Sequence, residues 1–527
     1  MSLRDKILQA QGTTEAAFSI GVKQEESTKE IVAEESFEMI EESHDYIEDW
    51  HKETNLSEQE FSDQQQYILN LMREDANEFN LDDLTKQQVE IRLIELVRRK
   101  DKQNRIKEEH LYPLVKSLAN DIKGYGPVQE FMDMPEVTDI RIIGDKCIRY
   151  KIRGHYYTSE KPEHRFRSEV HLHNWINRKI ALSRMGGRFD KSVARVNALL
   201  PDGSRLHAAT TISGVDEERD GKSIPTPYTI VSIRKFSKRY SVEELVETEY
   251  ELTKKRQEEW NQMLQQYEGV PIEDLYQKNR FMNLLIMAYL HLICRLRFTI
   301  LFAGGMGTGK TTTLNAIFPF IPSYHVCGIL EEAPEMQPDH EQTIRLWERP
   351  ANTEGEGAIL MEDLMKEILR MDVNRFFISE LRDKIAYLFL QGIINGHPGG
   401  GSTIHANSAQ AAKLRLITLA CSYPGSSRED VLHMVAEGVQ TFIHIEKTDD
   451  DEKYIGEIAE VVGIKDGDIE LKPIFTVEFS EAGDWGWTFH GLSERVKKEA
   501  RKARITIPAI LQEPREAFMP QTEQQAQ

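Results

Sequence analysis

A glycine-rich segment constrains the fold of this chain more than any other feature. The stretch FTILFAGGMGTGKTTTLNAIF, residues 298–318, contains Gly304-x-x-x-x-Gly309-Lys310-Thr311 between an apolar β-like run and a helical run. Glycines allow backbone N–H groups to close around phosphate oxygens, and the positive end of the following helix adds to the attraction. In this strand–loop–helix context the pattern predicts a phosphate-binding P-loop. A glycine-rich turn without a ligand is the structural alternative.

The P-loop assigns roles to individual residues. Lys310 is expected to contact the β- and γ-phosphates of ATP, and the hydroxyl of Thr311 is expected to bind Mg²⁺. Kinases, helicases and transporters share such a loop, so other motifs must narrow the function. The residues expected around the nucleotide are Gly304, Gly305, Met306, Gly307, Thr308, Gly309, Lys310, Thr311 and Thr312.

Two acidic segments follow the loop. RFFISELRD is an apolar run that leads to Glu380. An acid at the end of a strand beside the P-loop strand can hold the hydration shell of Mg²⁺, so Glu380 is predicted to share the metal with Thr311. GILEEAPEMQ places Glu331, Glu332 and Glu335 at the end of another strand, where a carboxylate can orient and deprotonate an attacking water. The structural alternatives are an ordinary strand-end carboxylate and a solvated acidic turn.

The segment NGHPGGGSTIHANS carries two histidines, His397 and His405, around three consecutive glycines. The spacing suits a metal clip, a nucleotide sensor or a mobile loop. A packing role for His405, on the β-like run STIHA, is a further alternative. The cysteines lie far apart without a CxxC pair, which favours reduced, buried thiols and weakens the metal clip. They are Cys147, Cys294, Cys327 and Cys421.

Composition and charge exclude several classes of protein. A hydrophobic content of 40% and a charged content of 29% are typical of a soluble globular chain. The net charge of −21 argues against a protein that grips nucleic acid along an extensive surface. Residues 1–110 contain 27 acidic and 14 basic residues, which indicates a separate acidic module. The N-terminus lacks the apolar core of a signal peptide, and the longest apolar stretch, 281–294, is shorter than the ~20 residues of a membrane-spanning helix, so we expect a cytoplasmic protein.

Periodicity and composition divide the chain into segments of different type. Val89, Leu93 and Leu96 share one face of a helix, short β-like runs follow Gly124, and apolar strands alternate with helices after Phe281. This alternation implies a parallel sheet covered on both faces. The predicted segments are an acidic, disordered tail at 1–55, a helical module at 56–123, a mixed α+β domain at 124–236, a helical connector at 237–280, an α/β domain at 281–511 and a polar tail at 512–527.

Four motifs in a fixed order resemble those of the type II/type IV secretion-system ATPase superfamily. They are the P-loop, ILEEAPE (the "Asp box"), ELRD (a degenerate Mg²⁺-site motif) and GHPGGGSTIHANS (the "His box"). GYGPVQEF, LPDGSRLHA and VSIRKF are similar to the N-terminal domain of the branch that contains tight-adherence (Flp) pilus assembly ATPases and conjugation-type traffic ATPases. The resemblance implies an α/β fold with a RecA-like P-loop domain at 281–511 and a PAS-like domain at 124–236. The acidic helical N-terminal extension lies outside the resemblance.

The resemblance also implies roles for the acids. Glu335 matches the general base for the attacking water, Glu331 its supporting acid, and Glu380 the Mg²⁺-site acid. Two departures stand beside them. Glu332 occupies a position where the box usually has Asp, and Ser379 replaces the glycine that usually precedes the Mg²⁺-site acid.

The remaining matches are histidines and arginines. His397 and His405 match the two His-box residues, which sense the γ-phosphate and couple nucleotide state to protein shape. Arg205 and Arg234 fall where arginines of the N-terminal domain approach the nucleotide and could neutralise charge during phosphoryl transfer. Leu199 stands where this branch often has another arginine.

The function implied by the resemblance is that of a cytoplasmic homo-hexameric ATPase. We expect it to bind ATP and Mg²⁺ between its N- and C-terminal domains and to drive pilus assembly or macromolecular export through a membrane platform protein. Membrane association would be peripheral, through partners, and direct nucleic-acid binding is not expected. The alternatives are a conjugation-type traffic ATPase that supports DNA transfer, a RecA-like nucleic-acid-dependent ATPase, and a scaffold that binds ATP without turnover.

Overall fold

The computed structural model describes residues 56–74, 84–152, 154–183, 188–219, 222–235, 254–268, 281–351, 356–449, 451–479 and 485–516. The predicted acidic tail at 1–55, most of the predicted connector and the end of the polar tail lie outside these ranges. The chain forms two compact units, Met1–Ala119 and Asn120–Gln527.

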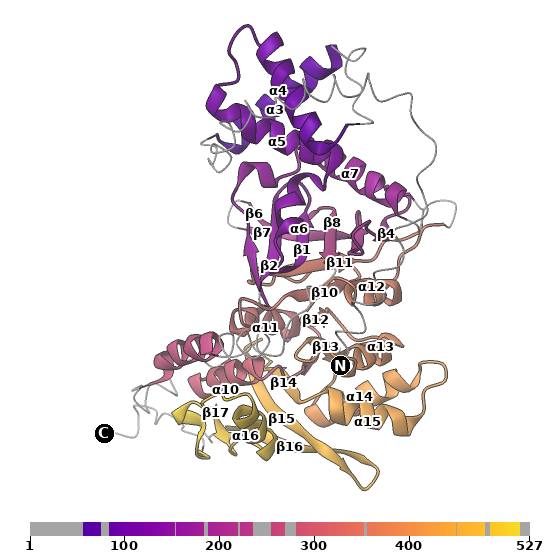
Figure 1. Ribbon diagram of the computed structural model, residues 1–527. Helices are drawn as coiled ribbons and strands as arrows, with labels where there is room; N and C mark the ends of the chain where they lie inside the picture. The colour runs from indigo at the N-terminus through magenta and orange to yellow at the C-terminus, as the bar shows by residue number, and fades with distance from the viewer. Residues whose placement is uncertain are drawn as a thin grey trace, which may run out of the picture. The chain divides into compact units, whose positions relative to one another are not determined.

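The first unit is helical in its described part (Figure 1). It contains α3 (Glu58–Glu74), α4 (Lys86–Lys100) and the beginning of α5 (Glu108–Lys123), which continues into the second unit. A capping box starts α4: the side chain of Thr85 accepts the backbone N–H of Gln88, and the Gln88 side chain returns a bond to the backbone of Thr85. The predicted apolar face of α4 is buried at Val89, Leu93 and Leu96.

A six-stranded antiparallel sheet begins the second unit. Its order is β3-β2-β1-β8-β5-β4, and α7 (Glu169–Leu182) packs on one face through a core that includes Trp175, Ile140 and Ile142. Because side chains alternate along a strand, Asp139 and Arg141 point to the other face, which is polar. The strands are β1 (Val137–Ile143), β2 (Cys147–Ile152), β3 (His155–Thr158), β4 (Arg195–Leu199), β5 (Arg205–Ala209) and β8 (Ile230–Arg234).

An eleven-stranded sheet forms the centre of the second unit, in the order β17-β16-β15-β14-β9-β13-β12-β10-β11-β6-β7. The six consecutive strands from β14 to β11 are parallel. Helices cover both faces, and two hydrophobic clusters form the core. The parallel strands are β9 (Ile300–Gly304), β10 (Cys327–Glu331), β11 (Thr343–Trp347), β12 (Arg375–Ile378), β13 (Gly401–His405) and β14 (Thr441–Lys447). The helices include α10 (Leu284–Arg295), α11 (Lys310–Ala316), α12 (Met361–Ile368), α13 (Ile385–Ile394), α14 (Ala409–Cys421) and α15 (Arg428–Gly438).

Antiparallel strands extend this sheet on both sides. One side carries β15 (Lys453–Lys465), β16 (Asp468–Phe479) and β17 (Trp485–Phe489), followed by α16 (Glu494–Lys502). The other side carries a hairpin of β6 (Ser213–Arg219) and β7 (Lys222–Pro227), which leaves the six-stranded sheet after β5 and returns to it at β8. Gly214 pairs with Arg345 of β11, and a Cβ on Gly214 would lie 2.3 Å from the carbonyl oxygen of Thr226. A side chain at this position would therefore break the junction between the hairpin and the parallel strands.

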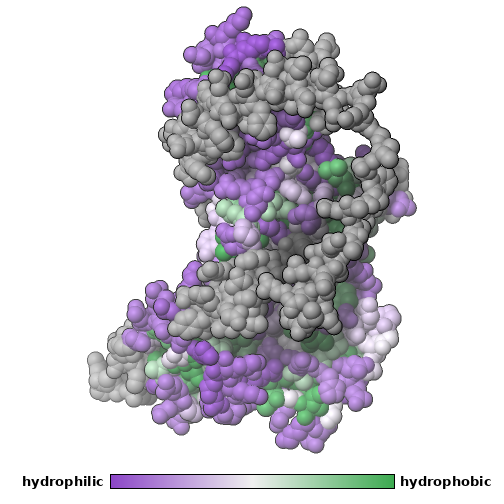
Figure 2. All heavy atoms as spheres, in the orientation of Figure 1, coloured by the Kyte–Doolittle hydropathy of each residue, from purple (hydrophilic) through white to green (hydrophobic). Residues whose placement is uncertain are grey.

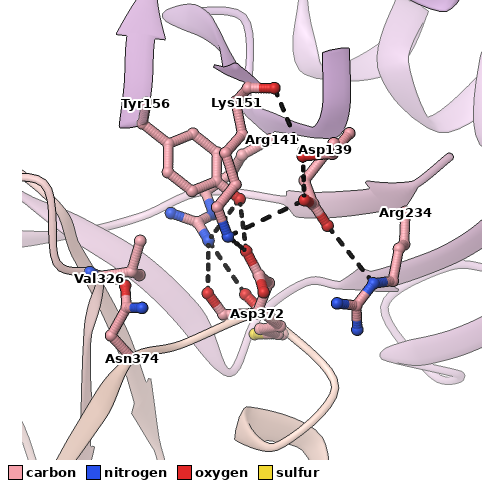
Figure 3. Close-up of polar contacts among 10 residues, drawn as sticks. Asp139, Arg141, Lys151, Tyr156, Arg234, Val326, Asp372 and Asn374 are labelled. Atoms are coloured by element: carbon pink, nitrogen blue, oxygen red, sulfur yellow. Dashed lines mark hydrogen bonds and ion pairs between the residues drawn. The ribbon is translucent and has the colours of Figure 1, made fainter. Parts of the chain in front are cut away.

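The polar face of the six-stranded sheet packs against the amino ends of the parallel strands (Figure 3). Arg141 donates to the carbonyl oxygen of Met371 at 3.0 Å, and Lys151 forms an ion pair with Asp372 at 2.6 Å. Tyr156 donates to the same carboxylate at 3.1 Å. These contacts place the six-stranded sheet beside the segment that leads into β12. This is the edge of the central sheet opposite to the carboxyl end of β9.

The surface seen in Figure 2 is mainly hydrophilic where the residues are described, with smaller hydrophobic areas between. Within the described ranges, no helix combines the length and the apolar character needed to cross a membrane.

Candidate nucleotide-binding site

The glycine-rich loop connects the carboxyl end of β9 with the beginning of α11. A Cβ on Gly304 would lie 2.5 Å from the hydroxyl oxygen of Thr308 and 2.6 Å from the carbonyl oxygen of Ile445, so only glycine fits there. Gly307 and Gly309 have φ angles of 74° and 90°, in the left-handed region that glycine adopts without strain. The loop therefore keeps its backbone clear of side chains at the turns.

Lys310 begins α11 and is mostly buried. Its ammonium group donates to the carbonyl oxygen of Gly305 at 2.7 Å and lies 3.4 Å from Nδ1 of His405. Burial lowers the pKa of Lys310, and the negative charge of Glu380 opposes this effect. The other predicted loop side chains differ in exposure: Thr308 is buried, Thr311 is half-buried, Thr312 is exposed and Met306 is 87% exposed.

His405 and Glu380 lie beside Lys310. Nε2 of His405, the last residue of β13, is 3.6 Å from a carboxylate oxygen of Glu380. Burial and then the charge of Lys310 lower the pKa of His405 below its ordinary value, so the ring is neutral at pH 7. Burial raises the pKa of Glu380, but the hydrogen bond and charge of Arg382, with His405 and Lys310, outweigh it and the net pKa is lowered. Glu380 is therefore an ionised carboxylate within reach of the loop.

The acidic turn after β10 is built around Glu331, which is fully buried. Its carboxylate accepts the backbone N–H groups of Glu335 at 2.8 Å and Met336 at 2.7 Å. Arg345 of β11 donates to the same carboxylate through Nε at 3.1 Å and also forms an ion pair with Asp216 of β6. Glu331 thus fixes the backbone of the turn, while the side chain of Glu335 is exposed.

Three further residues belong to this site although the sequence did not single them out. Arg382 lies 2.8 Å from Glu380 and 3.3 Å from Glu332, so it bridges the two acidic segments. Its place two residues after Glu380 in ELRD was the available signal. Arg345 lies outside the motifs, on the next strand after Glu331, and Asp216 is 129 residues before Arg345 and meets it only in the folded sheet.

Two lysines approach the loop from β14 and β15. A Cβ on Gly307 would lie 4.0 Å from Nζ of Lys447, and one on Gly309 would lie 3.7 Å from Cδ of Lys453. Lys447 is paired with Asp451 at 2.8 Å. The charge of Lys447 is thus balanced, and Lys453 is the second lysine beside the loop after Lys310.

His397 lies at the other end of β13 from His405. The five residues of β13 span about 16 Å at ~3.3 Å per residue, so the strand separates the two histidines. The ring of His397 packs edge-on against Phe376, and burial followed by the charge of Arg297 lowers its pKa. Of the two predicted sensor residues, the structure brings only His405 to the glycine-rich loop.

Arg205 and Arg234 lie side by side on the six-stranded sheet, where their Cα atoms are paired across β5 and β8. Both are exposed, and Nε of Arg234 is 3.8 Å from a carboxylate oxygen of Asp139 (Figure 3). Leu199, on β4, pairs with Arg205 and is 44% exposed. Across the described ranges, no hydrogen bond or ion pair joins either arginine to the glycine-rich loop. The structure does not bring them to Lys310.

The residues at the carboxyl ends of the parallel strands fit a nucleoside triphosphate with a divalent cation. The loop offers unobstructed backbone N–H groups and the ammonium group of Lys310, which suit phosphate oxygens. The hydroxyl of Thr311 and the ionised carboxylate of Glu380 are the hard oxygen ligands that Mg²⁺ prefers. These donors come from adjacent strands, because β9 lies beside β13 and β13 beside β12.

Comparisons of the sequence with known proteins find relatives among secretion-system proteins. The family model described as "Type II/IV secretion system protein" matches residues 276–439. The chain is 30% identical to protein VirB11 of Agrobacterium fabrum over 247 residues, which cover 46% of this chain and 67% of that protein. It is 31% identical to a putative conjugal transfer protein of Mycobacterium tuberculosis over 163 residues, 31% of this chain and 46% of that protein. The chain thus spans between about half and two thirds of the length of these relatives.

Among solved structures, the VirB11 ATPase of the Brucella suis type IV secretion system, in complex with sulphate, aligns with a TM-score of 0.47 and 20% identity. The alignment covers 63% of this chain and 91% of that one. The sequence match to the family model, at residues 276–439, contains both the phosphate-loop motif and the His box. The chain belongs to the type II/type IV secretion-system ATPase superfamily.

Proposed function

We propose that this protein hydrolyses ATP with Mg²⁺ and acts as a motor for pilus assembly or macromolecular export. The observation that carries the proposal is the grouping of Lys310, Glu380 and the turn of Glu335 at the carboxyl ends of neighbouring parallel strands. A lysine, a metal-binding carboxylate and a free carboxylate on a fixed turn are the groups that ATP hydrolysis requires. Membership of the superfamily supports the same activity.

Each residue has a separate task in this proposal. Lys310 and the backbone of the loop, from Gly304 to Thr312, bind the phosphates, and Thr311 and Glu380 hold the cation. Bound Mg²⁺ neutralises part of the phosphate charge. Glu335 orients the attacking water and accepts its proton. Glu331 is fully buried and occupied by Arg345 and two backbone N–H groups, so it positions the turn and does not act as the base.

His405 reports on the position of Lys310. In the structure Nζ of Lys310 lies between the carbonyl oxygen of Gly305 and the ring of His405. When the lysine turns to a phosphate, His405 loses this neighbour and keeps only Glu380. We assign the sensor role to His405; for His397, we infer a place at the amino end of β13 that is remote from the phosphates.

Arg205 and Arg234 could reach the nucleotide only in an assembly of several chains or after a domain movement. They lie on a sheet that packs at the amino ends of the parallel strands, whereas the glycine-rich loop lies at the carboxyl ends. A second copy of the chain in a homo-hexameric ring, or closure of a PAS-like N-terminal domain at 124–236 on a RecA-like domain at 281–511, would supply them.

The setting that we propose is the cytoplasmic face of the inner or plasma membrane, where a platform protein of a pilus or secretion machine would be the partner. A traffic ATPase that supports DNA transfer is the second candidate. The match to a putative conjugal transfer protein favours this candidate specifically. A RecA-like ATPase that acts directly on nucleic acid is a third, and it requires stimulation by single-stranded DNA.

The test is steady-state ATP hydrolysis by the wild type and by Glu335→Gln, with the particle mass measured by light scattering in ATP and Mg²⁺. We expect Glu335→Gln to bind ATP normally and to lose about 10²–10⁴-fold in turnover, the usual contribution of a general base. Glu332→Gln, on the same turn, is the matched control and should retain most of the activity. Near-normal turnover by Glu335→Gln would mean that another acid is the general base. A wild-type ring that binds ATP without hydrolysing it would indicate a scaffold.

A further inference from the structure

A second cationic site lies at the opposite edge of the parallel strands. A cavity of about 370 Å³ is open there between the six-stranded sheet, the helix at 254–264, the amino ends of the parallel strands and the segment after α16. Five of the residues that line it are basic and none is acidic. The basic residues are Lys151, Arg256, Arg295, Arg297 and Arg504.

The charge of this cavity is largely unbalanced. Lys151 is neutralised by Asp372 (Figure 3), but none of the four arginines forms an ion pair with a carboxylate in the described part of the chain. Arg297 donates to the carbonyl oxygen of Asn374 at 2.7 Å, and Arg295 donates to the backbone carbonyl of Arg256. The Nε atoms of Arg256 and Arg297 are buried without a hydrogen-bond partner in the same described part. Buried donors of this kind are normally satisfied, so an acceptor from outside the chain fits this place.

Aromatic contacts hold two of the guanidinium groups in position. Arg256 and Arg295 lie 5.4 Å and 5.7 Å from the ring centre of Tyr324, within the range of cation–π attraction. Arg297 has a φ angle of 59°, a left-handed conformation that a residue with a side chain adopts only at a cost in free energy. The cations are therefore held near one another by the fold, although like charges repel.

The neighbouring titratable groups respond to this charge. Burial lowers the pKa of Arg297, and the charge of Arg256 lowers it further. Burial and the surrounding arginines lower the pKa of His325 well below its ordinary value. Glu259, on the same helix as Arg256, raises the pKa of Tyr324 but forms no ion pair with the arginines within the described residues.

We propose that this cavity binds a compact anion that carries at least two phosphate-type charges, such as a small di- or triphosphate. Guanidinium groups match phosphate oxygens with paired hydrogen bonds, and several converging arginines favour a polyanion over a single carboxylate. The ligand would contact the helix at 254–264, the amino ends of the strands and the residues after α16 together. Its binding would therefore fix the connector helix to the central sheet, independently of ATP hydrolysis at the other edge.

The test is calorimetric titration of inorganic pyrophosphate into the full chain carrying Lys310→Ala, which removes the main phosphate contact of the glycine-rich loop. In this background we compare Arg256→Gln with Lys254→Gln. Both changes delete one positive charge from the same helix, but Lys254 does not line the cavity. Because a hydrogen bond to a charged group contributes about 1.5–3 kcal/mol, Arg256→Gln should weaken pyrophosphate binding at least about tenfold, whereas Lys254→Gln should leave it within about twofold.

A second variant tests whether a loss of pyrophosphate binding could result from misfolding. Arg504 is exposed at the cavity, and Arg504→Gln should weaken pyrophosphate binding in the same direction without changing the circular dichroism spectrum. Absence of pyrophosphate binding in the Lys310→Ala background would overturn the proposal, since the glycine-rich loop would then be the anion site. Equal losses in Arg256→Gln and Lys254→Gln would overturn it as well, because the effect would be one of net charge.

Discussion

Two fully buried arginines show how differently the two edges of the central sheet are built. Arg345, near the carboxyl ends, is neutralised by Glu331 and Asp216. Among the described residues, the acceptors of Arg375, at the amino end of β12, are all neutral: Nδ1 of His325 at 3.0 Å and the carbonyl oxygens of Gly399 and Cys294 at 3.1 and 2.7 Å. Burial lowers the pKa of Arg375 to about 10.

The counter-charges of the cations determine how each edge of the sheet can bind an anion. At the carboxyl edge the arginines are already paired with carboxylates, Arg345 with Glu331 and Asp216, and Arg382 with Glu380 and Glu332. A bound phosphate is therefore expected to contact Lys310, whose neighbours are the carbonyl oxygen of Gly305 and the ring of His405. At the amino edge Lys151 is paired with Asp372, whereas the four arginines of the cavity form no ion pair with a carboxylate in the described part of the chain. An anion there adds charge balance without displacing an existing partner.

The largest expected effect is on the free energy of unfolding, which should differ between variants of the two buried arginines. Arg345→Met leaves the buried Glu331 and the partly buried Asp216 without their cationic partner and should lower the free energy of unfolding by about 3–5 kcal/mol. Arg375→Met leaves only neutral acceptors unpaired and should cost about 1–3 kcal/mol. Urea denaturation followed by circular dichroism measures both. An equal or larger loss for Arg375→Met would remove the distinction between the edges.

Nucleotide affinity should depend on one edge only. Lys310→Ala should weaken ATP binding by roughly 100-fold, because a charge-assisted contact to phosphate is worth up to about 3 kcal/mol. Arg256→Gln, at the other edge, should change ATP affinity less than about twofold, since screening weakens the effect of a distant charge. Lys498→Ala, on the exposed side of α16, is the control for charge removal. Fluorescent-nucleotide titration gives the three constants, and unchanged affinity in Lys310→Ala would refute the assignment of the loop.

A smaller effect should follow from loosening the bridge between the acidic segments. Arg382 is 55% exposed in its side chain, so its ion pairs with Glu380 and Glu332 are worth at most about 1 kcal/mol. Arg382→Gln should therefore lower steady-state ATP turnover by about fivefold or less, with the fold intact. Arg428→Gln removes an exposed arginine that pairs with Asp468, far along the chain, and should have no effect on turnover. A loss of more than about 100-fold in Arg382→Gln would mean that this arginine contacts the reacting phosphate itself.

The smallest effect concerns pH and the amino edge. Burial lowers the pKa of His155 and of His291 to about 4. Because these folded values lie below the ordinary 6.5, the neutral rings contribute their full stability above pH 6.5, and this contribution is lost as the pH falls from 6.5 towards 4. The thermal midpoint should be flat between pH 7 and 8 and decline below pH 6.5.

His291→Phe offers a direct check of this dependence. The ring of His291 stacks on Phe320 with centres 4.7 Å apart, so phenylalanine can keep the packing and cannot be protonated. The variant should lose part of the decline between pH 6.5 and pH 4. An unchanged slope in differential scanning calorimetry would show that His291 does not contribute to it.

The sequence predicted the motifs whose residues are contiguous in the chain, but not the contacts that form between distant segments in the folded protein. Four short motifs predicted the superfamily, which the comparisons confirm, and the glycine-rich loop lies between a strand and a helix as its context indicated. The resemblance assigned His397 and His405 together as sensors, and the sequence marked STIHA as β-like, but it did not show that this strand carries the two histidines to opposite ends. The ion pair of Arg345 with Asp216 and the basic cavity could not be predicted, since they join segments that are more than a hundred residues apart in the chain.

The hairpin of β6 and β7 has a mechanical consequence. Because β6 is hydrogen-bonded to β11, the hairpin belongs to the eleven-stranded sheet, although the chain on either side of it forms β5 and β8 of the six-stranded sheet. A rigid hinge between the hairpin and the parallel strands would have to break this pairing and leave buried polar groups unpaired. Sheets accommodate rotation between neighbouring strands by twisting. We therefore expect any closure of the six-stranded sheet towards the glycine-rich loop to twist this hairpin while its pairing with β11 stays intact.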